Sequence, residues 1–118
     1  MISPGGPILN DSRLQIQRIF SGLKYPTSMA FLGPNDIIVS EKDGSVERVI
    51  NGQFQNKPLI KVNVDKTDER GLDGLAVSKN ESRNITNIFL YYTEFKSTYH
   101  SHGITLGNRV YTNYRIIA

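Results

Sequence analysis

A cluster of acidic residues is the first stretch of this sequence whose residue types suit metal chemistry. Its carboxylates are Asp65, Asp68, Glu69 and Asp73. Carboxylate oxygens are the ligands that calcium prefers, but two basic residues, Lys66 and Arg70, lie inside the stretch. It also lacks the regular alternation and the glycine of an EF-hand loop. We therefore favour a charged, solvated turn over a calcium site here.

Two histidines and a group of aromatic residues offer other chemistry. His100 and His102 would lie on the same side of an extended segment, but a metal site needs further ligands and none is evident nearby, so an exposed loop is favoured. The aromatic residues are Phe89, Tyr91, Tyr92, Phe95 and Tyr99. They would suit stacking against a sugar, yet aromatic residues in an interior strand more often form core, and we favour that interpretation.

The elements that position these residues are predicted to be short strands. Between residues 25 and 64 there are four apolar runs, each ended by a turn signal: 28–32, 36–40, 46–50 and 58–64. Asp43-Gly44 and Asn51-Gly52 favour tight hairpins, because such turns need positive φ angles that Gly and Asn tolerate. Four strands joined by short turns predict an antiparallel meander of about 40 residues, the size of one β-propeller blade.

The rest of the chain also favours strands. Residues 14–20 begin with apolar-polar alternation, and residues 71–77, 87–94 and 108–117 are predicted strands. Residues 78–86 are predicted to be a polar connection, and residues 95–107 a longer loop. Because no helical period persists along the chain, we predict an all-β protein.

A weak internal repeat supports blades. The pattern around Ala30 recurs around Ala76, 46 positions later, close to the roughly 40–50-residue period of propeller blades. We expect a flexible lead-in over 1–13 and a partial β-propeller domain over 14–118. The domain would comprise a leading strand at 14–21, a first blade at 25–64 and an incomplete second blade at 71–118. Since a propeller closes with about four to eight blades, the sequence predicts a propeller fragment of about two blades with unpaired, aggregation-prone edges.

Composition excludes several classes of function. The net charge of +3 comes from scattered basic residues, which argues against a nucleic-acid groove. There is no Cys, hence no disulfide framework or thiolate metal site, and no apolar run approaches the roughly 18 residues of a membrane helix. No signal peptide is visible, whereas three Asn-x-Ser/Thr triplets, at Asn10, Asn80 and Asn84, slightly favour an exported protein.

Four segments together resemble the soluble glucose/sorbosone dehydrogenase family, the quinoprotein aldose dehydrogenases. They are GLKYPTSMAFL at 22–32, DIIVSEKDGSVERVING at 36–52, ERGLDGLAV at 69–77, and 87–94 with GNRVY at 107–111. In order and spacing they look like the N-terminal part of that six-bladed propeller. In the family an N-terminal strand can complete the last blade, a role that residues 14–20 would fit.

The resemblance implies oxidation of the C1 hydroxyl of an aldose sugar to a lactone, with pyrroloquinoline quinone (PQQ), calcium and an electron acceptor. We also expect an extracellular or cell-surface protein. The family's catalytic histidine, cofactor ligands and calcium ligands belong to later blades, so no catalytic, cofactor or metal residue is assigned in this chain. The fragment alone is expected to bind no cofactor and to be inactive.

One position carries over from the family. The loop before the Gly-Leu strand approaches the central pocket there, often with a glutamine near the sugar, and the matching residue here is Glu69. Its carboxylate would accept hydrogen bonds from sugar hydroxyls, unless the adjacent Arg70 holds it in an ion pair.

Two alternatives remain for the whole protein: a non-catalytic propeller that acts as a binding or cell-surface interaction domain, and a calcium-dependent lactonase-type hydrolase.

Overall fold

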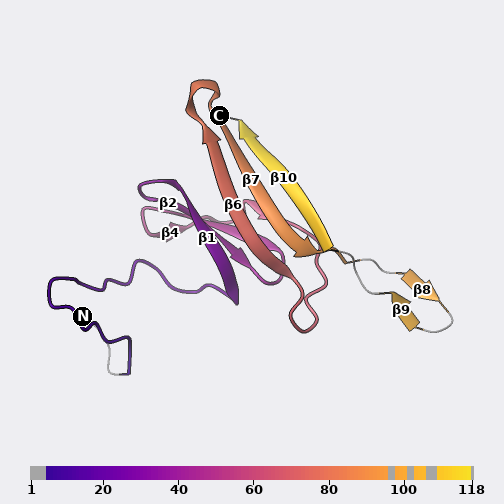
Figure 1. Cartoon of the computed structure of the whole chain (residues 1–118), viewed down its shortest axis with the longest axis horizontal. Coiled ribbons are helices and arrows are strands. Elements are labelled where there is room, and N and C mark those ends of the chain that lie inside the picture. The colour runs from indigo at the N-terminus through magenta and orange to yellow at the C-terminus, as the bar shows by residue number, and fades with distance from the viewer. Residues whose placement is uncertain (1–4, 96–97, 101–102, 106–108, 118) are drawn as a thin grey trace.

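The computed structural model describes residues 5–95, 98–100, 103–105 and 109–117. Two antiparallel sheets and a separate hairpin make up its strands (Figure 1). The first sheet contains β1 (Pro26–Gly33), β2 (Asp36–Glu41), β3 (Ser45–Ile50), β4 (Gln53–Phe54) and β5 (Ile60–Lys61). The second contains β6 (Leu72–Asn80), β7 (Ile85–Thr93) and β10 (Arg109–Ile117), with β7 in the centre. A 3-10 turn, η1 (Glu81–Arg83), joins β6 to β7, and β8 (Thr98–His100) pairs with β9 (Gly103–Thr105).

The all-β prediction is confirmed, and the antiparallel sheets are those expected of β-propeller blades. The described residues contain no α-helix, and none of their helical segments is long and apolar enough to cross a membrane. The turn chemistry also holds. Asn51 and Gly52 both have positive φ angles, of 52° and 78°, as a two-residue hairpin turn of type I′ requires.

The two sheets repeat the same pairing register, which confirms the internal repeat. Ala30 lies opposite Ile38 in the first sheet, and Ala76 lies opposite Phe89 at the equivalent place in the second. Other equivalent pairs are Met29 opposite Val39 with Leu75 opposite Leu90, Phe31 opposite Ile37 with Val77 opposite Ile88, and Pro26 opposite Glu41 with Leu72 opposite Tyr92. Both sheets even carry an irregularity at the equivalent position, just after Pro26 and just after Leu72. The two sheets are therefore successive copies of one structural unit.

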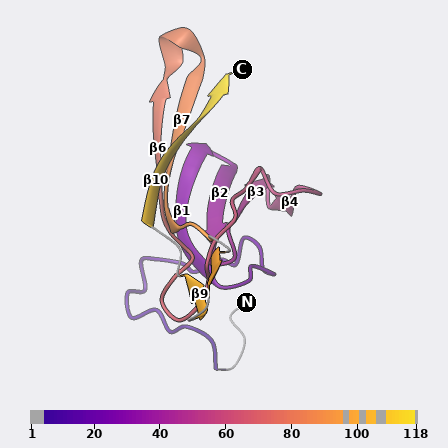
Figure 2. The same ribbon diagram turned by 90° about the vertical axis from the view of Figure 1, so that its right-hand side faces the viewer.

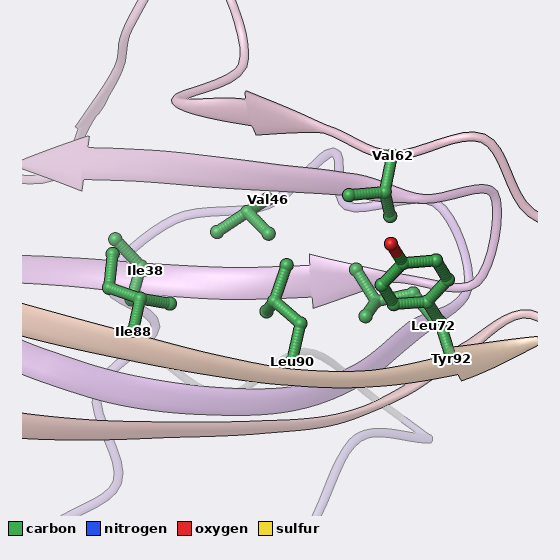
Figure 3. Close-up of a cluster of buried hydrophobic side chains, with 7 residues drawn as sticks. All are labelled: Ile38, Val46, Val62, Leu72, Ile88, Leu90 and Tyr92. Carbon is green, nitrogen blue, oxygen red and sulfur yellow. The ribbon is translucent and has the colours of Figure 1, made fainter. Parts of the chain in front are cut away.

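The sheets pack face to face around one apolar cluster (Figures 2 and 3). Its buried members are Ile38, Val46, Val62, Leu72, Ile88, Leu90 and Tyr92. Figure 3 shows Ile38 and Val46 of the first sheet, with Val62, facing Ile88, Leu90 and Tyr92 of the second. Burying each such aliphatic side chain stabilises the fold by roughly 1.5–3 kcal/mol. This cluster is the main attachment between the two sheets.

Strand alternation puts different residues on the far side of each sheet. Phe89, between Ile88 and Leu90 in β7, is 44% exposed, and Met29 and Phe31 of β1 are also exposed. By the repeat, Ala76 and Phe89 occupy the positions that Ala30 and Ile38 use to contact the second sheet. The sheets thus stack as consecutive propeller blades do, each offering one face to the next.

Three sequence-based expectations need correction. Residues 14–20 form no strand, and their side chains are mostly exposed. A strand requires a partner for its backbone groups, and no described strand pairs with this segment. The segment instead contacts the first sheet through Phe20, whose ring packs edge-on against Phe54 with centroids 5.5 Å apart.

The predicted strand 58–64 and the predicted loop 95–107 also differ. Residues 53–61 pair with β3 as two short pieces, β4 and β5, because the intervening segment contains Pro58, which has no N–H to donate. Beyond β5 the chain leaves the first sheet, and Val64 forms an isolated bridge with Glu94. Within 95–107, residues 98–105 include the β8–β9 hairpin rather than only loop.

Candidate functional site

The connections that could form a site gather at one end of the two sheets. Strand direction alternates in an antiparallel meander, so every second connection returns to the same end. One end carries the turn at 42–44, the loop at 62–71 and the segment that follows β7; the other end carries the turns at 34–35 and 51–52 and η1. Figure 1 shows the loop that precedes β6 at the bottom of the second sheet and the η1 turn at its top.

The loop that contains Glu69 is fixed by a series of local hydrogen bonds. The Asp65 N–H donates to the Thr93 carbonyl (2.9 Å), and the Asp65 carboxylate accepts from the Thr67 N–H (3.0 Å). The Arg70 N–H then donates to the Thr67 carbonyl (3.0 Å), which closes a turn with Asp68 at a positive φ of 54°. The loop is consequently tied to β7 at its start and folded tightly in its middle.

The first sheet holds the same loop from the opposite side. The Lys42 ammonium donates to the Asp68 carbonyl, and the Lys42 carbonyl accepts from the Leu72 N–H (3.1 Å). Gly71 lies between these contacts with a φ of 129°, and its carbonyl accepts from the Thr93 N–H (3.1 Å). A side chain at Gly71 would overlap the Lys42 carbonyl oxygen. Only glycine permits this close approach of the 42–44 turn to the loop.

Glu69 lies exposed on the outside of this turn. Arg70 does not hold it: the Arg70 guanidinium pairs with Asp65 across 3.4 Å, and Asp65 is 8% exposed. Among the described residues, no hydrogen bond or ion pair of the Glu69 side chain is found. Arg70 thus forms its ion pair with Asp65 and not with Glu69, so Glu69 faces solvent on a fixed loop.

Comparison with known families identifies the family of this chain. A sequence profile of the Glucose / Sorbosone dehydrogenase family matches residues 23–115, which include the Glu69 loop and both sheets up to the last two residues of β10. The chain belongs to the glucose/sorbosone dehydrogenase family. No curated protein matches it significantly. Family membership supports the fold and a sugar as the class of substrate.

The described part of this chain supplies no set of ligands for the cofactors expected of a glucose/sorbosone dehydrogenase. None of its groups of His, Asp and Glu has the arrangement to hold a metal ion. Three basic residues near the loop, which would suit an anionic quinone, are already engaged: Lys42 with the Asp68 carbonyl, Arg70 with Asp65 and Lys61 with Asp43. Lys66, within the loop itself, is exposed. A single exposed lysine does not make a built site for PQQ, and the described carboxylates and histidines form no group that could hold calcium.

The other candidate residues are placed as follows. Asp65 of the acidic stretch bonds Arg70 and Thr67, so this carboxylate stabilises the turn. His100 ends β8, and His102 lies outside the described residues. Tyr92 belongs to the core as predicted, whereas Phe89 and Phe95 are about half exposed, at 44% and 45%. Tyr92 is therefore not part of any stacking surface that Phe89 and Phe95 could form.

The sequence analysis did not identify a group of carboxylates on the first sheet of this family member. Glu41 is only 5% exposed and accepts a hydrogen bond from the Lys24 N–H (2.6 Å), which attaches the segment before β1 to the sheet. Burial, and then the negative charges of Glu41 and Asp43, raise the pKa of Glu47, with Lys61 opposing. A hydrogen bond to Glu41 adds to this rise, because two carboxyl groups share one only when one is protonated.

Asp43 behaves differently although it is close by. Burial alone would raise the pKa of Asp43, but hydrogen bonds from the Ser45 N–H and from Lys61 outweigh it and lower the pKa below its usual value. The Lys61 ammonium lies 3.2 Å from the Asp43 carboxylate. Only the spacing of Glu41 and Glu47 across the 42–44 hairpin could have indicated this group from the sequence.

This raised pKa predicts the effect of replacing Glu47 with glutamine. Above its raised folded pKa Glu47 is charged in both states, and the folded state then bears the cost of burial and of repulsion. As pH falls through the raised folded pKa towards the ordinary value of 4.5, the folded chain takes up the proton first and the cost disappears. We therefore expect Glu47→Gln to raise the midpoint of thermal unfolding at pH 7, with a smaller gain near pH 4.5.

The matched control for this prediction is Glu81→Gln, which changes an exposed carboxylate in η1. It should leave the midpoint nearly unchanged at both pH values. A Glu47→Gln variant that is less stable than the parent chain at pH 7 would show that the Glu47 carboxylate has a favourable partner instead.

Proposed function

We propose that this chain forms part of a PQQ-dependent aldose dehydrogenase, in which the loop 65–71 contacts the sugar whose C1 hydroxyl is oxidised to the lactone. One observation carries the assignment of the loop. It is held by both sheets, through Lys42 on one side and Thr93 on the other, while Glu69 stays exposed at its tip. A fixed loop that presents an unengaged carboxylate is suited to binding a polyhydroxylated ligand.

The chemistry of Glu69 in this proposal is recognition. An ionised carboxylate accepts hydrogen bonds at both oxygens, so it can receive two neighbouring sugar hydroxyls. Hydrogen bonds to a charged group contribute more than neutral ones, about 1.5–3 kcal/mol. Because the loop is already held in place, little conformational entropy is lost on binding.

The remaining parts of the proposal concern the whole protein. PQQ and calcium would be held by residues outside the described part of this chain, and electrons would pass to a separate acceptor. The protein would act outside the cell or at its surface. The 118-residue chain by itself is expected to reduce no dye with glucose, because its described residues supply no ligands for the quinone.

The test uses the full-length gene product supplied with PQQ and calcium, and follows dye reduction over a series of aldoses. Glu69→Ala should raise the KM for the sugar roughly tenfold or more, the equivalent of one charged hydrogen bond, with little change in kcat. Glu69→Gln keeps an acceptor oxygen and should retain most of the affinity. Glu81→Ala, at the far end of the sheet, is the control and should match the parent protein.

The outcomes separate the two parts of the proposal. Quinone-dependent oxidation with no change of KM in Glu69→Ala would remove the loop from the sugar site and leave the activity standing. No oxidation of any aldose, combined with saturable sugar binding by calorimetry, would establish the non-catalytic binding domain instead.

A further inference from the structure

The turn between β6 and β7 contains two of the three Asn-x-Ser/Thr triplets, Asn80-Glu81-Ser82 and Asn84-Ile85-Thr86. Asn80 is the last residue of β6, and Asn84 follows η1 with left-handed backbone angles (φ 53°, ψ 40°). Residues 78–84 are all exposed, and the turn lies at the top of the second sheet in Figure 1. The turn therefore offers asparagine side chains away from the packed core.

The two triplets of the turn differ in how available their asparagine amides are. The Asn80 side-chain oxygen accepts a hydrogen bond from the Ser82 hydroxyl (2.8 Å), and Asn80 pairs with Ile85 in the sheet. Asn84 occupies the turn itself. Its backbone N–H donates to the Glu81 carbonyl (3.3 Å), and no hydrogen bond of its side chain is found within the described residues. Asn84 is thus the least constrained of the two acceptors in the turn.

The type of the middle residue in each triplet also favours Asn84 as the acceptor. Asp11 follows Asn10 and Glu81 follows Asn80, whereas Ile85 follows Asn84. The donor for N-glycosylation is a lipid-linked oligosaccharyl pyrophosphate, which is strongly anionic. A carboxylate next to the acceptor repels such a donor, most of all Glu81, since the Asp11 carboxylate is paired with the Arg13 guanidinium (2.9 Å). The neutral Ile85 does not repel it.

We propose that Asn84 carries an N-linked glycan. In the transfer step a bond forms between the Asn84 amide nitrogen and C1 of the first sugar, the bond from C1 to the lipid pyrophosphate oxygen breaks, and the amide nitrogen loses a proton. The pyrophosphate leaves with the lipid, and no oxidation or reduction is involved. The step requires an exported protein, as proposed above, but does not depend on sugar oxidation.

The fold accommodates a glycan at Asn84 without loss of packing. Asn84 lies in the turn that contains η1, which has no buried residues, so attachment disturbs neither the apolar cluster nor a strand pairing. The turn is also at the opposite end of β6 from the loop 65–71. A large, solvated group there would cover the far end of the sheet and leave the Glu69 loop open.

The experiment expresses the 118-residue chain behind a cleavable secretion signal, in cells that perform N-glycosylation. Glycopeptides are then mapped by mass spectrometry before and after enzymatic removal of N-glycans. We expect the glycan on the peptide containing Asn84. Thr86→Val keeps the β-branched shape in β7 and removes the hydroxyl that the triplet needs, so it should abolish the modification. Ser82→Ala and Asn10→Gln should retain it.

A circular dichroism spectrum of Thr86→Val that matches the parent chain would show that its loss of glycan does not come from misfolding. The proposal is overturned if the secreted chain is unmodified, or if its glycan survives Thr86→Val and disappears in Ser82→Ala or Asn10→Gln. None of these results depends on dehydrogenase activity, so the two proposals fail separately.

Discussion

Replacing Gly71 with alanine should lower the free energy of unfolding by about 3 kcal/mol or more. The φ angle of 129° at this position is one that residues with a side chain rarely adopt. A Cβ atom would also overlap the Lys42 carbonyl oxygen and lie 2.8 Å from the Lys42 Cγ. The backbone cannot move away cheaply, because the Gly71 carbonyl and the Leu72 N–H are both hydrogen-bonded.

The effect would be measured by urea denaturation of the full chain, with Gly52→Ala as the control. Gly52 also has a positive φ, of 78°, but the nearest atom to an added Cβ is the Ile19 carbonyl oxygen at 3.4 Å. This variant carries the backbone strain without the overlap and should cost only about 1 kcal/mol. Equal losses in the two variants would mean that the close approach of Lys42 to Gly71 does not exist in solution.

The parts of the fold that the sequence predicted are those that local chemistry decides. Asn51-Gly52 fixes a hairpin turn because both residues accept positive φ, and the recurrence around Ala30 and Ala76 fixes the repeat. The register could be inferred only roughly from the pattern. Only the structure shows that the register is the same in both sheets, including the irregularity after Pro26 and Leu72. The reason is that register depends on which partner strand supplies the hydrogen bonds.

The errors have the same physical origin. Residues 14–20 alternate as a strand does, but alternation reports a side-chain pattern and says nothing about a partner for the backbone. The sequence likewise left open whether Arg70 pairs with the adjacent Glu69, and the turn at 67–70 directs it to Asp65 instead. The partner of such a side chain depends on the backbone geometry of the turn. Composition and spacing do not determine that geometry.

The candidate site was predictable to the level of the loop. The resemblance identified Glu69, and the structure shows what holds that loop: Lys42 from the preceding hairpin and Thr93 from β7. Both contacts join residues far apart in sequence, so no local signal announces them. The buried Glu41 was missed for a similar reason, since its burial depends on the segment that its carboxylate attaches through Lys24.

Shortening Leu90 to alanine is expected to lower the free energy of unfolding by about 2–5 kcal/mol. Leu90 lies in β7, the central strand of the second sheet, and is 2% exposed within the cluster that joins the two sheets. Its loss would leave a cavity where the sheets meet. Because the surrounding strands are paired on both sides of β7, they can close little of that space.

Phe89→Ala is the matched control, since Phe89 is the adjacent residue in the same strand and points to the opposite face. It is 44% exposed, so its truncation should cost less than Leu90→Ala even though it removes a larger side chain. Urea denaturation of both variants would decide the packing of the sheets. If Phe89→Ala proved the more destabilising, the face carrying Ala76 and Phe89 would be the buried one, and the sheets would stack in the reverse sense.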